Sequence, residues 1–118
     1  MEELLIECSP GISGDMLLAA FYDLGVPKEV FEKPLLDLGL DESYSLSFSE
    51  AKSKSLRGIK TNVKILDNSQ KRTWKDIKNL IMKGNLEKTL EKNIIEVFSA
   101  LAKAESTVHG IAQEDVYF

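Results

Sequence analysis

SYSLSFSEAKSKSLRGIKTNVKI, residues 43–65, is the stretch that decides the fold of this chain. Its first part, residues 44–48, alternates apolar side chains with serines, and residues 58–66 alternate in the same way. A period of two is typical of β-strands that bury one face. Because strands so near in sequence usually pair, the pattern predicts an antiparallel pair joined by a long polar connection over residues 51–57.

The segment before this pair predicts one strand and two helices. The short apolar run Leu4–Cys8 is typical of a buried strand. The apolar spacing after Ser13 predicts a helix that Gly25 ends in a left-handed conformation. A second helix should begin near Pro27, and Pro34 should kink or interrupt it, because proline lacks an N–H and crowds the preceding turn.

The segment after the pair predicts two further helices and the start of a strand. Asp67–Gln70 is a turn cluster, and Thr73 should begin a helix with Asp76 at the reciprocal capping position. The longest helix should span about residues 86–108, and Val116–Phe118 is typical of a strand start. The order β-αα-β-β-αα-(β) indicates an α/β chain of the two-layer α+β kind, with a small ferredoxin-like sheet covered by helices on one face.

Length and composition are those of a single globular domain, residues 1–118. A chain of 118 residues buries roughly two-thirds of its unfolded surface and needs no disulfide or structural metal to fold. No apolar run approaches the roughly 18 residues of a membrane span, so we expect no membrane partner. The N-terminus is acidic, unlike a secretory signal, and the one cysteine cannot form an internal disulfide. We therefore expect a cytoplasmic protein.

The net charge of −4 hides a strong asymmetry along the chain. Residues 1–51 have a charge balance of −9, residues 52–92 of +8, and the remainder of −3. A basic block of this kind can bind phosphate, although it is more often a solvated face of helices and strands. Lys52, Lys54 and Arg57 fall in the predicted connection and give the phosphate alternative a small extra weight. No aromatic side chains interleave them, so we expect no nucleic-acid partner.

The segment Glu7–Met16, ECSPGISGDM, is the main candidate for a binding site. A strand that leads through a glycine-bearing loop into a helix N-terminus presents unpaired N–H groups, and the helix dipole favours negative charge there. Gly11 and Gly14, which flank Ile12 and Ser13, let the backbone approach a ligand closely. The spacing matches neither a P-loop nor a dinucleotide fingerprint, and a serine-capped turn explains the same residues.

Four chemically active side chains are candidates for metal binding. Glu7 and Asp15 could converge on a hard cation such as Mg²⁺ or Mn²⁺, although the helix dipole alone favours an acid in the first turn. Cys8 is more typical of a small buried side chain than of a nucleophile or a soft metal ligand. His109, the only histidine, falls at the end of the long helix. One histidine and one cysteine cannot complete a transition-metal site without carboxylates, water or another subunit.

Three blocks of the sequence together resemble one family. GISGDMLL at residues 11–18, with DLGV at 23–26, resembles its N-terminal signature. GIK at 58–60 and AKAESTVHG at 102–110 resemble its later blocks in the same order. Over nearly its whole length the chain resembles the N-terminal part of LarC, the nickel insertion proteins of nickel-pincer cofactor biosynthesis. The matching site positions are Gly11, Ser13, Gly14 and Asp15 in the loop, and Glu105 and His109 in the long helix.

The resemblance implies a metal insertion reaction of the lyase class. Family members use CTP with Mn or Mg to place nickel into pyridinium-3,5-bisthiocarboxylic acid mononucleotide. On this chain the loop Gly11–Gly14, with Ser13 in it, would hold the phosphate of that cofactor precursor through its amides. Asp15, Glu7 and His109 would bind the metal ion or hand it on.

The chain also departs from the family pattern. Family members continue beyond the position of Phe118 with a segment that bears His and Glu, and then with a C-terminal domain, where we expect CTP to bind. Neither is present in this sequence, so we expect the chain alone neither to bind CTP nor to insert nickel. We expect a homo-oligomer. The alternative is a non-catalytic module that oligomerises through the open face of its sheet, or one that binds phosphate or a nucleotide.

Overall fold

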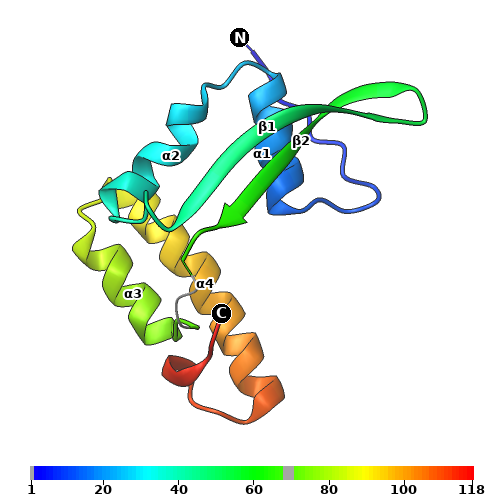
Figure 1. The fold of residues 1–118 in the computed structure, drawn as a ribbon. Helices are drawn as coiled ribbons and strands as arrows, with labels where there is room; N and C mark the ends of the chain where they lie inside the picture. The colour runs from blue at the N-terminus through cyan, green and yellow to red at the C-terminus, as the bar shows by residue number, and fades with distance from the viewer. Residues whose placement is uncertain (1, 68–70) are drawn as a thin grey trace.

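The computed structural model describes residues 2–67 and 71–118. In these residues four α-helices and one β-hairpin form two layers (Figure 1). The hairpin stands between two helix pairs in the sequence, as predicted. The elements in order are α1 (Gly14–Asp23), α2 (Lys28–Asp37), β1 (Tyr44–Ser53), β2 (Leu56–Ile65), α3 (Trp74–Lys83), α4 (Lys88–His109) and the 3₁₀ helix η1 (Gln113–Asp115).

The β-hairpin confirms the predicted antiparallel pair but not its long connection. β1 and β2 pair over their full length, from Tyr44 opposite Ile65 to a two-residue turn. The turn residues Lys54 and Ser55 have φ values of 48° and 69°. Positive φ at both positions is what a type I′ turn requires, and the twist of that turn matches the twist of the strands. The expected connection over 51–57 is therefore wrong, because the ladder runs to the turn itself.

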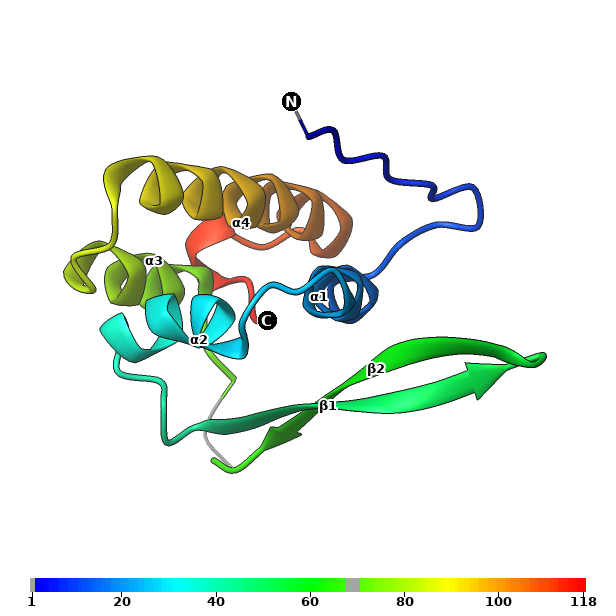
Figure 2. The same cartoon turned by 90° about the horizontal axis from the view of Figure 1, so that it is seen from above.

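Helices α1 and α2 cover one face of the hairpin, and the other face stays open (Figure 2). Tyr22 of α1 stacks on Phe48 of β1 with ring centres 4.0 Å apart, and Phe31 of α2 contacts the same ring at 5.9 Å. The serines of β1 point to the opposite face, because successive side chains of a strand alternate. The predicted two-layer class, with helices on one face of a small sheet, is confirmed.

The main hydrophobic core lies between α3, α4 and the C-terminal residues. Trp74, Ala102 and Val116 are buried there, and Ala102 has no exposed surface. The Trp74 and Phe98 rings are nearly parallel, with their centres 6.0 Å apart, and Phe118 meets Phe98 edge-on. This core ties the end of the chain to α3 and α4.

The predicted helix ends are largely confirmed. The Asp76 N–H donates to Thr73 Oγ1 and the Thr73 N–H donates to the Asp76 carboxylate, both at 3.2 Å, which completes the capping box. Gly25, at φ 102°, follows α1, and the N–H of Val26 donates to the carbonyl of Phe21 as in a Schellman motif. These ends are set by local chemistry, which is why the sequence predicts them.

Pro34 does not interrupt α2, so the predicted interruption is wrong, while the predicted kink stays a prediction. The helix continues to Asp37, three residues beyond the proline. A proline at this position removes the single hydrogen bond to the carbonyl of Val30. Val30 is exposed, so water can satisfy that carbonyl and the helix persists.

The strand expected at Leu4–Cys8 does not form. Residues 2–8 belong to no helix or strand, and the Leu5 side chain is 86% exposed. A strand needs a neighbouring edge to pair its N–H and C=O groups, and an apolar run does not supply one. That expectation is wrong for the described residues.

The last residues also pair differently from the prediction. Tyr117 forms a single bridge with Thr73, and the Trp74 N–H donates to the Val116 carbonyl at 2.8 Å. Val116–Phe118 thus lies against the start of α3 rather than in the sheet. A four-stranded ferredoxin-like sheet is therefore not formed within residues 2–67 and 71–118, where the sheet has two strands. Of the turn predicted at Asp67–Gln70, residues 68–70 lie outside the described residues.

Candidate functional site

The opening loop keeps the form that the sequence predicts around the start of α1. A turn closes where the Gly11 N–H donates to the Cys8 carbonyl at 2.8 Å. Ser13 is the N-cap of α1, and Gly14 is the first residue of the helix. Gly11, Ser13 and Gly14 are all exposed, so the N-terminus of α1, where the first N–H groups lack helical partners, lies at the surface.

Asp15 is held in a network at the N-terminus of α1. The Ser13 hydroxyl donates to the Asp15 carboxylate instead of capping the backbone, and the Met16 N–H donates to the same oxygen at 3.0 Å. Both bonds favour the charged form, Ser13 most, and they hold the pKa of Asp15 below its ordinary value. The side chain is therefore a carboxylate at neutral pH.

The backbone of Asp15 is also fixed from the sheet. The buried Thr61 hydroxyl in β2 donates to the Asp15 carbonyl at 2.7 Å. This bond spans 46 positions of the sequence and joins the start of α1 to the hairpin. The end of the candidate loop is thus held against β2, and a binding site requires side chains that are held in place by the surrounding structure.

Replacing Ser13 by alanine should raise the pKa of Asp15 toward its ordinary value. Folding lowers the pKa of Asp15, so the ionised carboxylate stabilises the folded state at pH values above the pKa that Asp15 has in the unfolded chain. This stabilisation is lost as the pH falls through the pKa that Asp15 has in the folded state. Carboxyl-detected NMR titration of wild type and Ser13→Ala measures the change, with Ser9→Ala as the control. An Asp15 pKa that is identical in all three proteins would show that the hydroxyl does not control it.

Glu7 and Cys8 lie before the loop, in the extended N-terminal stretch. Both side chains are exposed. The expectation that Cys8 is a small buried side chain is therefore wrong, because the strand that would have buried it does not form.

His109 lies at the opposite end of the sequence, in the last turn of α4. Its Nε2 is 3.1 Å from a carboxylate oxygen of Glu105, one helical turn earlier. The two residues that match the later family block thus meet on one helix face. Gly110 follows in a left-handed conformation, φ 65°, and ends the helix as predicted.

The structure does not gather the candidate metal ligands into one cluster. Within residues 2–67 and 71–118, no three side chains of histidine, cysteine, aspartate or glutamate lie close enough together to hold a metal ion. Asp15 and the pair Glu105–His109 stand on different helices, and Glu7 lies in neither. The shared metal role of Glu7, Asp15 and His109 stays a prediction.

Arg57 is already paired, which weakens the case for a phosphate site on the hairpin. Its Nε lies 2.7 Å from a carboxylate oxygen of Glu50, and its Nη1 lies 3.1 Å from one of Asp23. The two acids raise the pKa of Arg57, Glu50 most. Arg57 therefore links the hairpin to the end of α1, and Lys52 and Lys54 are left near the turn.

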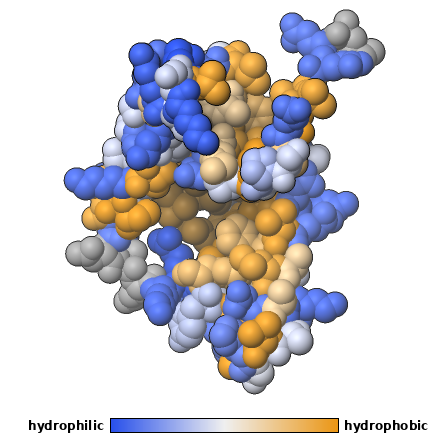
Figure 3. Space-filling model, turned by 90° about the vertical axis from the view of Figure 1, so that its right-hand side faces the viewer, coloured by the Kyte–Doolittle hydropathy of each residue, from blue (hydrophilic) through white to orange (hydrophobic). Residues whose placement is uncertain are grey.

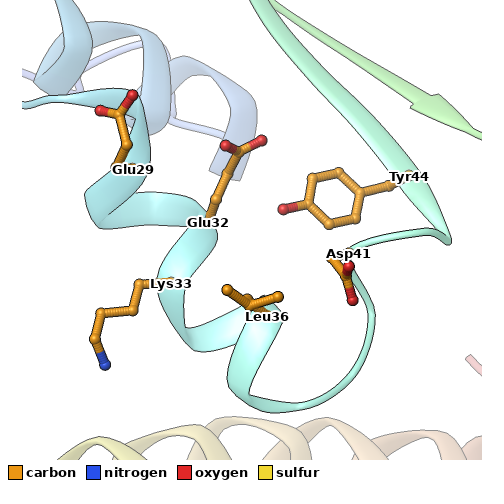
Figure 4. A pocket seen from close by; sticks show the side chains of 6 residues that line it. All are labelled: Glu29, Glu32, Lys33, Leu36, Asp41 and Tyr44. Atoms are coloured by element: carbon orange, nitrogen blue, oxygen red, sulfur yellow. The ribbon is translucent and has the colours of Figure 1, made fainter.

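Sequence reasoning missed an acidic hollow between α2 and β1 (Figure 4). It has a volume of about 470 Å³, and its lining includes Glu29, Glu32, Asp41 and Tyr44. The Tyr44 hydroxyl points toward α2. Burial raises the pKa of Tyr44, and the charges of Glu32 and Asp41 raise it further. The spacing of Glu29 and Glu32 places two acids on one face of a helix, which is a weak indication of a site. Only the fold brings Tyr44 beside them.

Comparison with known proteins defines the class. Residues 4–118 match the family model described as nickel insertion protein. The chain is 35% identical over its full length to the pyridinium-3,5-bisthiocarboxylic acid mononucleotide nickel insertion protein of Akkermansia muciniphila, of which it covers 31%. A protein of the same description from a Nocardioides species is 34% identical over 96% of the chain. A putative nickel insertion protein of Pelobacter propionicus is 38% identical over 95% of it. No solved structure matches the chain.

The chain belongs to the nickel insertion protein family, and the resemblance carried by its three sequence blocks is confirmed. It spans 28% to 31% of the length of these relatives. None of its helices in residues 2–67 and 71–118 has the length and apolar character needed to cross a membrane.

Proposed function

We propose that this chain is the N-terminal, nickel-handling module of a protein that inserts nickel into pyridinium-3,5-bisthiocarboxylic acid mononucleotide. The family match over residues 4–118 carries this proposal, together with relatives of that description. The chain spans less than a third of those relatives, so insertion belongs to the complete protein.

The loop at the start of α1 is the proposed contact with the mononucleotide. Exposed N–H groups of a helix N-terminus bind phosphate well, because they are unpaired and the helix dipole favours an anion. Gly11 and Gly14 allow the close approach, and the Ser13 hydroxyl orients Asp15 beside them. Asp15 remains ionised next to this loop, and its carboxylate has lone pairs beyond the two hydrogen bonds that it accepts. That carboxylate is the proposed nickel ligand of the loop, with Glu7 as a second acid nearby in sequence.

His109 and Glu105 form a second proposed nickel contact. A carboxylate that accepts a hydrogen bond from one imidazole nitrogen fixes the tautomer and makes the other nitrogen a better metal ligand. With Nε2 directed at Glu105, Nδ1 of His109 is the nitrogen left for nickel. Nickel is the cargo of this reaction, so two partial sites that pass it on suit the task better than one closed cage.

The rest of the proposal concerns the complete protein. CTP with Mn or Mg acts outside this chain, the chain is inactive alone, and the whole works as a homo-oligomer in the cytoplasm. The alternative is a non-catalytic module that self-associates, and the many large apolar side chains exposed on this chain favour it.

His109→Ala should weaken nickel binding by the isolated chain about tenfold or more, the scale on which metal sites lose affinity when a partner is removed. Equilibrium dialysis against Ni²⁺, on protein purified without a histidine tag, measures the dissociation constant. Glu105→Gln should weaken binding less, and Glu114→Gln is the control. Equal nickel affinity in wild type and His109→Ala would remove His109 from the proposal.

A further inference from the structure

The first described residues form an apolar segment that joins no sheet within residues 2–67 and 71–118. We call residues 2–7 the N-terminal arm. At its centre Leu4, Leu5 and Ile6 are all exposed, Leu5 most. Three glutamates flank this centre and give the arm a charge of −3. An exposed run of large apolar side chains is typical of a surface that contacts another protein, a ligand or a membrane.

The same molecule has an apolar hollow between its two layers. We call it the interlayer hollow. It has a volume of about 590 Å³, within the range of roughly 300–1,000 Å³ typical of pockets that hold ligands. Leu38 and Leu40 line it from the α2 side, Ile77 and Ile81 from α3, and Phe98 from α4. Figure 3 shows apolar surface gathered around a hollow in the middle of one face.

Charge favours the arm on the α3 side of this hollow. Asp67 and Arg72 both line it, and residues 71–83, which include α3, carry five basic side chains and one acidic one, a balance of +4. The arm carries the opposite charge on both sides of its apolar centre. Opposite potentials of this kind steer a segment to its site and fix its register. None of the arm's own residues lines the hollow of the same chain.

We propose that the N-terminal arm of one copy of this chain fills the interlayer hollow of a second copy, and that the second copy returns the contact. Leu4–Ile6 enter between α2 and α3, and Glu2 and Glu3 face the basic side of the hollow at Arg72. Because each copy has both an arm and a hollow, two copies can form the same contact in both directions, which gives a dimer with two-fold symmetry. The inference rests on the self-association in the proposed function, but on neither nickel nor the mononucleotide.

Leu5→Asp should convert this dimer to a monomer. The substitution removes a buried leucine side chain and adds a charge at the contact, so it should weaken dimerisation at least tenfold, on the order of what burial of one leucine contributes. Sedimentation equilibrium on the purified metal-free chain, over a wide range of concentrations, measures the dissociation constant. Leu56→Asp is the matched control, because Leu56 is also a highly exposed leucine but lies beside the hairpin turn. It should dimerise like wild type.

A disulfide trap locates the contact. In a Cys8→Ser background, a copy with Leu4→Cys is mixed with a copy that carries Ile65→Cys at the hollow, and oxidation should yield the mixed disulfide. Leu56→Cys in place of Ile65→Cys should yield little. A monomeric wild type, or a Leu5→Asp protein that dimerises normally, overturns the inference. Nickel binding measured on the same proteins is a separate readout, so failure of the nickel proposal can be told from failure of this one.

Discussion

Trp74→Ala is expected to lower the free energy of unfolding by about 3–5 kcal/mol, the range for removal of a large aromatic side chain from a core. Trp74 is 5% exposed and packs with Ala102 and Val116 in the main core. Its ring also lies over Phe98, so the substitution opens a cavity where α3, α4 and the C-terminal residues meet. Among residues 2–67 and 71–118, few others are as deeply buried.

Urea denaturation followed by far-ultraviolet circular dichroism measures this loss, because the substitution removes the only tryptophan and its fluorescence. Trp74→Phe keeps a ring in the core and should lose less stability, which keeps the test informative if the alanine variant does not fold. Val97→Ala is the surface control, since Val97 is 69% exposed. A Trp74→Ala protein within about 0.5 kcal/mol of wild type, as for a typical surface substitution, would contradict this description of the core.

Asp15→Ala is expected to lower nickel insertion by about ten- to a hundredfold in a full-length protein that carries this chain. The carboxylate is the proposed nickel ligand of the loop, and it is held beside the helix N-terminus by Ser13 and Met16. Its side chain is exposed, so its removal should change the stability of the chain by much less than Trp74→Ala does.

Separate measurements of insertion and unfolding distinguish the two roles of Asp15. If Asp15 is a nickel ligand, its removal should lower the insertion rate and leave the free energy of unfolding nearly unchanged. If Asp15 has only a structural role, its removal should lower both. Asp37→Ala is the control, because Asp37 is also an aspartate of a short helix and pairs with Lys33 on the surface of that helix. Insertion rates that do not differ between Asp15→Ala and Asp37→Ala would exclude Asp15 from nickel handling.

Features that depend on neighbouring residues could be predicted from the sequence. The alternation in residues 44–48 and 58–66 predicts the hairpin, and Thr73 with Asp76 predicts the start of α3. The turn at Lys54 and Ser55 was missed because neither residue is the glycine or asparagine that usually marks a type I′ turn. The strand at Leu4–Cys8 failed for a different reason, since strand formation needs a partner edge that no local pattern reveals.

The same division applies to the candidate site. The loop from Gly11 to Asp15 follows from local spacing, and so does the Glu105–His109 pair, four residues apart on one helix. The support that Thr61 gives to Asp15 joins elements 46 positions apart, so only the fold reveals it. The acidic hollow at Tyr44 and the interlayer hollow are equally non-local.

The most direct test of the proposed function is nickel insertion by a chimaera. The matched region of the Akkermansia muciniphila relative is replaced by this chain, and nickel incorporated into pyridinium-3,5-bisthiocarboxylic acid mononucleotide is measured against the unmodified relative. We expect the chimaera to insert nickel, and to lose at least nine-tenths of that activity, on the order of tenfold, with Asp15→Ala. A chimaera that folds and remains soluble but inserts no nickel would contradict the proposal that this chain is a nickel-handling module.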